Sequence, residues 1–132
     1  MSERKLEGLE PQSVFHYFEE ICAIPHGSRN TKAISDYLVA FAKAHNLTYR
    51  QDESNNVVIF APGTCGLEDH APVILQGHMD MVCEKDASCT LDMAVDGLDV
   101  THDDQFVFAR GTTLGGDDGI AVAYALAILA DN

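Results

Sequence analysis

The sequence predicts an α/β fold, and three observations support that class. Two segments near the start repeat apolar residues at helical spacing, short β-branched runs follow them, and an apolar helix comes last. The chain has 132 residues, which allows one domain or part of one. Apolar residues make up 46% of it, so the chain has material for a core and is not of the disordered class.

Two amphipathic helices are predicted in the first third of the chain. Pro11 suits the first turn of the first helix, and Pro25 ends it. Asn30 or Thr31 could cap the second helix, and Asn46 suits its C-terminal end. Each helix has an apolar stripe that is expected to pack on a core: Val14, Phe15, Phe18, Ile21 and Cys22 in the first, and Ile34, Tyr37, Leu38, Phe41 and Ala42 in the second.

Short strands are predicted after these helices. Residues 48–51 and 56–61 are the first two, and the second is rich in β-branched residues. Residues 73–76 form a near-continuous apolar run, which predicts a buried strand. Residues 106–108 predict one arm of a hairpin, and a glycine-rich loop at 111–116 leads into the last helix.

The last helix carries no charged side chain between Gly119 and Ala130. A helix that is apolar all round is normally buried on every side, and a chain of this length offers few layers to cover it. We therefore expect the chain to be the N-terminal piece of a longer protein. Studied alone, it is expected to leave an apolar face of this helix uncovered and to self-associate or pack in a non-native way.

Charge and cysteine usage narrow the function classes. Twenty-one acidic residues against eight basic ones give a net charge of −13, which argues against nucleic acid or an anionic membrane as the partner. The first residues lack the apolar segment of a signal peptide, and the longest apolar run, 120–130, is well short of a membrane span. The four cysteines form no C-x-x-C pair, which favours reduced thiols in the cytoplasm.

The first candidate for chemistry is QGHMDM at 76–81, which follows the predicted strand at 73–76. His78 and Asp80 alternate along the chain and are expected to point the same way. A carboxylate beside an imidazole can accept one ring N–H, which fixes the tautomer and leaves the other nitrogen free to bind a metal. The alternative is a histidine and an aspartate in a polar loop, because the H-x-D pattern alone is weak.

The second candidate is RGTTLGGDDG at 110–119. It lacks the Gly-Lys-Ser/Thr ending of a phosphate loop, and its two aspartates would repel phosphate. Adjacent carboxylates such as Asp117 and Asp118 suit a divalent cation and can bridge two metals, although helix capping would explain one of them. The remaining histidines lie in predicted helices, loops or a hairpin and are poorer candidates: His16, His26, His45, His70 and His102.

Together, VILQGHMDMVCEK at 73–85 and ARGTTLGGDDGIAVAYALAILAD at 109–131 resemble the M20 metallopeptidases, most closely the aminoacyl-histidine (Xaa-His) dipeptidase branch. The similarity extends to ICAIPHGSRN and NNVVIF and covers essentially the whole chain. It implies the N-terminal part of a zinc-peptidase-like, three-layer catalytic domain, with a mixed sheet flanked by helices. Residues 1–132 would then lack the rest of that domain and an inserted lid and dimerisation domain.

The resemblance also implies roles for single residues. His78 would ligate one of two zinc ions, and Asp117 would bridge both. Asp80 would have the catalytic role of orienting His78 and keeping it basic. Asp118 stands where the family has Asn or Asp and is not expected to be a ligand, and the bond between Asp117 and Asp118 is expected to be cis. Co²⁺ or Mn²⁺ are alternatives to Zn²⁺.

The expected function of the parent protein is the metal-dependent hydrolysis of small dipeptides of the Xaa-His type. A cytoplasmic homodimer is expected, with no nucleic-acid or membrane partner. The general-base glutamate and further ligands would lie downstream, so the chain alone is expected to bind zinc weakly and to be inactive. The alternatives are a related M20 deacylase or aminotripeptidase, and a non-catalytic α/β module that binds a divalent ion or a partner.

Overall fold

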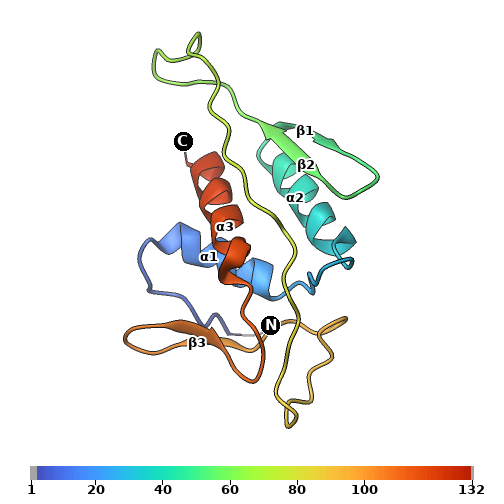
Figure 1. The fold of residues 1–132 in the computed structure, drawn as a ribbon. Helices are drawn as coiled ribbons and strands as arrows, with labels where there is room; N and C mark the ends of the chain where they lie inside the picture. Colours follow the sequence, from blue (N-terminus) through green and yellow to red (C-terminus); the bar gives the residue numbers. More distant parts are fainter. Residues whose placement is uncertain (1–2, 132) are drawn as a thin grey trace.

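The computed structural model describes residues 3–131, and Figure 1 shows the order of their elements. Helices α1 and α2 come first, two short hairpins follow, and helix α3 is last, which confirms the predicted α/β class. The bounds are α1 Gln12–Cys22, α2 Lys32–Ala44, β1 Thr48–Gln51, β2 Val57–Phe60, β3 Val100–His102, β4 Val107–Ala109 and α3 Gly116–Ala130.

The core is built mainly where α1 packs on α3. The stripe predicted for α1 faces inward, with Phe18 and Ile21 only 3% and 1% exposed. On α3 the inward face includes Leu126, which is 2% exposed. Burial of these side chains supplies the main driving force for packing the first and last helices together. The other buried members of this cluster are Leu6, Val14, Cys22, Ile34, Leu38, Phe41, Val100, Val122, Ala123 and Ala127.

Helix α2 packs against the β1–β2 hairpin. The two strands are antiparallel, with Thr48 opposite Phe60. Ser35 of α2 is fully buried, and its hydroxyl donates to the carbonyl of Asn55 at the turn (2.9 Å). Asn46 has a φ of 56°, so the left-handed residue predicted to end this helix is confirmed.

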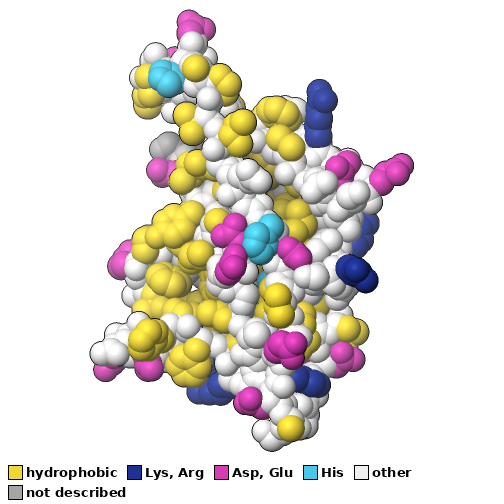
Figure 2. All heavy atoms as spheres, viewed as in Figure 1, with side chains coloured by type: hydrophobic (Ala, Val, Ile, Leu, Met, Phe, Trp, Pro, Cys, Tyr) yellow, Lys and Arg dark blue, Asp and Glu magenta, His cyan; other side chains and the backbone are white. Residues whose placement is uncertain are grey.

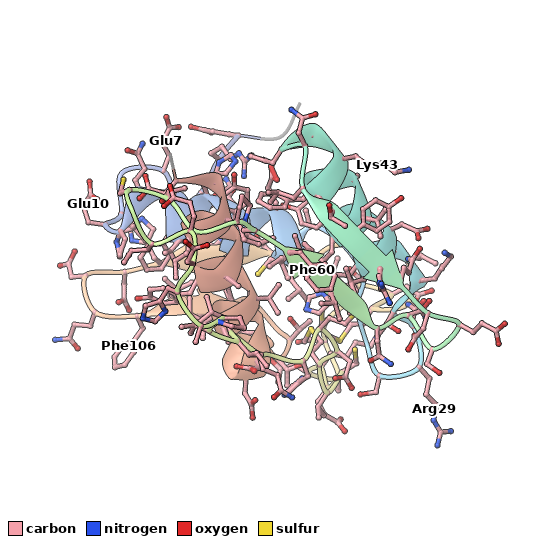
Figure 3. The ribbon with its side chains drawn as sticks, turned by 90° about the horizontal axis from the view of Figure 1, so that it is seen from above. Glu7, Glu10, Arg29, Lys43, Phe60 and Phe106 are labelled. Carbon is pink, nitrogen blue, oxygen red and sulfur yellow. The ribbon has the colours of Figure 1, made fainter. Side chains whose placement is uncertain are left out.

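The predicted hairpin around residues 106–108 is also confirmed. Strand β3 pairs with β4 in antiparallel register, with Val100 opposite Ala109. Phe106, in the turn, is 67% exposed and projects away from the body of the molecule (Figure 3). Both sheets described in residues 3–131 are antiparallel pairs, so a mixed sheet flanked by helices is not formed within them.

The prediction of a buried strand at residues 73–76 is wrong for this structure. The segment runs as an extended connection past α3 (Figure 1), but it belongs to neither sheet. Val73, Ile74 and Leu75 are 77%, 87% and 55% exposed. A strand needs a neighbour for its backbone groups, and among residues 3–131 no backbone–backbone hydrogen bond reaches residues 72–77. The apolar pattern therefore correctly indicated an extended segment but not its burial.

Several large apolar side chains are exposed at the surface. Tyr124 and Ile128 of α3 are 48% and 56% exposed, which fits the expectation of an uncovered apolar face on this helix. Hydrophobic side chains are spread over much of the face drawn in Figure 2. Within residues 3–131, no helix combines the length and hydropathy needed to span a bilayer. All four cysteines are free thiols, as their spacing predicted.

Candidate metal centre

The imidazole of His78 lies between two carboxylates. Its Nε2 atom is 3.0 Å from Oδ1 of Asp117, and its Nδ1 atom is 3.0 Å from Oδ1 of Asp80. The Nδ1 atom is also 3.1 Å from the carbonyl oxygen of Asp80. The structure thus brings together three of the four side chains singled out in the two motifs, although the motifs lie far apart in the sequence.

The contacts among His78, Asp80 and Asp117 shift the pKa of His78 and the pKa of Asp80 in opposite directions. The hydrogen bond to Asp117, helped by the carbonyl and charge of Asp80, raises the pKa of His78 above its ordinary value. The pKa of Asp80 is lowered, first by the hydroxyl of Ser28 and then by the nearby His78. Asp80 is therefore held as an anion, which is the state that accepts the ring N–H of His78.

Asp117 and Asp118 lie at the N-terminal end of α3. Asp117 and Asp118 have non-helical backbone angles, so the regular helix begins after them. The peptide bond between them is cis, as expected. The side chain of Asp117 is 96% exposed, apart from its contact with His78. Oδ2 of Asp118 instead accepts a hydrogen bond from the backbone N–H of His78 (3.2 Å). Asp118 is therefore hydrogen-bonded to the backbone of the first motif.

Two glycines allow the motifs to approach each other. A Cβ on Gly77 would lie 3.1 Å from both Ala121 Cβ and Asp118 Oδ2. Gly115 has a φ of 75°, and a Cβ there would lie 2.9 Å from the sulfur of Met81. Gly115, the first of the two glycines before the aspartates, thus has a packing reason, whereas nothing lies within 4 Å of a Cβ on Gly116.

The segment that carries Asp80 is fixed from both sides. The backbone N–H of Met81 donates to the carbonyl of His26 (3.0 Å), and the N–H of Ser28 donates to the carbonyl of Met81 (3.0 Å). On the other side, the hydroxyl of Thr113 donates to the carbonyl of Val82 (2.7 Å). These bonds set the backbone position of the first motif against the glycine loop.

Two residues of this region were missed by sequence reasoning. Ser28 donates its hydroxyl hydrogen to Oδ2 of Asp80, across a separation of 52 residues. His26, treated as an ordinary loop histidine, is 2% exposed, and burial lowers its pKa. No local pattern marks either residue, because both act through contacts with a distant part of the chain.

The side chains of His78 and Asp117 carry donor atoms of the types that bind divalent transition metals. An imidazole nitrogen and a carboxylate oxygen are ordinary zinc ligands at about 2.0–2.2 Å. Two such atoms bound tetrahedrally to one ion lie about 3.3–3.6 Å apart. His78 Nε2 and Asp117 Oδ1 are 3.0 Å apart, a direct hydrogen-bond distance slightly shorter than that range. Among residues 3–131, no group of three or more His, Cys, Asp or Glu side chains is placed to hold a metal. The chain therefore brings two donors together, short of the usual four.

Comparisons with known proteins identify relatives of the chain. It is 42% identical over 127 residues to the cytosol non-specific dipeptidase of Escherichia coli (strain K12). That match spans 96% of this chain and 26% of the relative. The chain is homologous to dipeptidases. Among solved structures, the aminoacylhistidine dipeptidase of Vibrio alginolyticus matches 98% of the chain with a TM-score of 0.91 and 38% identity.

The chain spans about a quarter of the length of both relatives. No family model matches the chain. The TM-score shows that the fold of nearly the whole chain is shared with part of a solved dipeptidase.

Proposed function

We propose that the chain supplies part of the dinuclear zinc centre of an M20-type dipeptidase. The observation that carries this proposal is the placement of His78, with Nε2 facing Asp117 and Nδ1 facing Asp80. A histidine held in this way by a carboxylate is a common arrangement for a zinc ligand. The homology to two dipeptidases supports the same reaction class.

Each residue has a defined task in this proposal. His78 would hold one ion through Nε2, and Asp117 would share its carboxylate between both ions. Asp80 holds the Nδ1 proton of His78, so the lone pair of Nε2 stays available. Asp118 fixes the backbone of His78 through its amide. Bound zinc supplies Lewis acidity toward the scissile carbonyl and lowers the pKa of water. Co²⁺ or Mn²⁺ would suit the same donors.

The two donors cannot hold a dinuclear centre alone, because a zinc site takes about four ligands. We propose that the remaining ligands and the general-base glutamate belong to a longer protein of which residues 1–132 form the N-terminal portion of the catalytic domain. That protein would complete the three-layer domain and add the lid and dimerisation domain. The 132-residue chain alone is expected to bind zinc weakly and to be inactive.

The substrate class follows from the relatives. One is named a non-specific dipeptidase and the other an aminoacylhistidine dipeptidase. We propose small dipeptides as substrates, Xaa-His dipeptides among them, in a cytoplasmic homodimer. The names of both relatives favour this activity over that of a deacylase or aminotripeptidase. The net charge of −13 gives no support to a nucleic-acid partner.

The test is the hydrolysis of Xaa-His and other dipeptides by the longer protein that contains this chain. Activity should be lost with a chelator and restored by zinc. His78→Ala and Asp117→Ala should each lower kcat/KM by at least about a hundredfold, because each removes a metal ligand. His102→Ala and Asp104→Ala are matched controls, since both residues lie in the β3–β4 hairpin. Full activity of the His78 and Asp117 variants would contradict the proposal.

A further inference from the structure

The contact between Ser28 and Asp80 extends the candidate centre by one residue. The hydroxyl of Ser28 donates to Oδ2 of Asp80 at 2.5 Å. The other carboxylate oxygen, Oδ1, faces the ring of His78. Both oxygens of Asp80 are therefore in use, one toward Ser28 and one toward the histidine. A carboxylate held at both oxygens cannot rotate about its terminal bond without breaking one contact.

Ser28 is itself held in place by backbone bonds. Its N–H donates to the carbonyl of Met81, and the N–H of Met81 donates to the carbonyl of His26. His26 is buried, and its Nδ1 is 2.6 Å from the carbonyl of Ile24. Ser28 and Asp80 therefore sit on two segments that are tied together at adjacent residues. The next residue, Arg29, extends outward to solvent (Figure 3).

We propose that Ser28 is a positioning residue of the metal centre, which acts by locking the carboxylate of Asp80 so that His78 keeps Nε2 directed at Asp117. The inference rests on the proposed function, since it concerns the orientation of a proposed ligand. Without the hydroxyl, Oδ2 of Asp80 turns to solvent and the carboxylate is free to rotate. The ring of His78 then loses the carboxylate at Nδ1, keeps only the main-chain carbonyl of Asp80 there (3.1 Å), and binds metal less well.

A purely structural role for Ser28 makes a different prediction. In that case the hydroxyl only ties residues 26–28 to residues 80–81, and its loss lowers the thermal midpoint without changing the ring of His78. Ser28→Ala removes the hydroxyl, whereas Ser28→Thr keeps it at an exposed position. Ser54→Ala is a matched control, because Ser54 is an exposed serine in the β1–β2 turn.

The experiment records the tautomer of His78 by ¹⁵N NMR in the metal-free 132-residue chain carrying Asp117→Ala, which removes the competing acceptor at Nε2, at an alkaline pH where the ring is neutral. With serine at position 28 the proton is expected on Nδ1. Ser28→Ala should shift the population toward the Nε2–H tautomer, and Ser28→Thr and Ser54→Ala should leave it unchanged. An unchanged tautomer in Ser28→Ala, or an equal shift in Ser28→Thr, would overturn the inference.

A zinc titration near pH 7 of the longer protein that contains this chain, with the same substitutions, is the second readout. Ser28→Ala should weaken zinc binding about tenfold, the lower end of what loss of a supporting partner does at metal sites, and Ser28→Thr should restore it. Equal affinity in Ser28→Ala and the unaltered protein would also overturn the inference. If the unaltered longer protein shows no zinc binding that depends on His78, the proposed function fails, and the tautomer comparison still decides the role of Ser28.

Discussion

The Nε2 atom of His78 lies 3.0 Å from Oδ1 of Asp117, although 39 residues separate the two. His78 follows the extended segment at 73–76, and Asp117 lies at the start of α3. The hydroxyl of Thr113, which donates to the carbonyl of Val82, and the carboxylate of Asp118 hold these two places together. The predictions below test the fold that brings the pair together and the chemistry that it supports.

Asp80→Asn should weaken zinc binding by about ten- to a hundredfold, the usual cost of losing the partner that orients a histidine ligand. The amide lacks the negative charge that stabilises the ring N–H bond of His78. A competition titration with a chelating dye measures the affinity. Asp104→Asn, at an exposed position of the β3–β4 turn, is the control. Equal zinc affinity in Asp80→Asn and the unaltered protein would show that Asp80 does not support metal binding.

Gly115→Ala should destabilise the fold more than Gly8→Ala. Both glycines have a positive φ, 75° and 93°, so each alanine has a backbone cost of about 1–2 kcal/mol. Only at Gly115 does the new Cβ meet Met81, which adds on the order of 1–3 kcal/mol, whereas nothing lies within 4 Å at Gly8. Urea unfolding compares the two variants. The same loss in both would contradict the close approach of the glycine loop to Met81.

Leu126→Ala should lower the free energy of unfolding by about 2–5 kcal/mol, because Leu126 is buried between α3 and α1. Ile128→Ala, two residues along the same helix, should change it by less than about 1 kcal/mol, since Ile128 is exposed. Chemical denaturation followed by circular dichroism measures both. A large effect at Ile128 would show that this face is covered in solution, by self-association for example.

Acid should destabilise the protein partly through Glu20. Burial raises the pKa of Glu20, but hydrogen bonds from Tyr37 and Arg4 outweigh that effect, and the net pKa is below the ordinary value. A lowered pKa in the folded state gives stability that is present above the ordinary carboxyl range and is lost as the pH falls through the folded-state pKa. Unfolding measured from pH 7 to pH 3 should show this loss.

Glu20→Gln is the variant that isolates this contribution. It should cost about 1 kcal/mol at neutral pH and flatten the acid side of the stability profile. Glu53→Gln, at an exposed turn position, should leave the profile unchanged. A profile in Glu20→Gln as steep as that of the unaltered protein would assign the acid sensitivity to other groups.

Local patterns in the sequence predicted most of the elements but not all of their surroundings. The stripes of α1 and α2 and the left-handed Asn46 are set by spacing and by single-residue conformational preference, so they could be predicted. The burial of residues 73–76 could not, because it depends on neighbours elsewhere in the fold. For the same reason the motifs indicated His78, Asp80 and Asp117 but gave no sign of Ser28, whose contact spans 52 residues.

The central claim is that His78 and Asp117 hold a metal ion together. Diffraction data collected at the zinc absorption edge from crystals of the longer protein, grown with zinc, test it most directly. The predicted result is an anomalous peak within about 2.0–2.3 Å of both His78 Nε2 and a carboxylate oxygen of Asp117. Zinc bound elsewhere, with His78 still hydrogen-bonded directly to Asp117, would contradict the account.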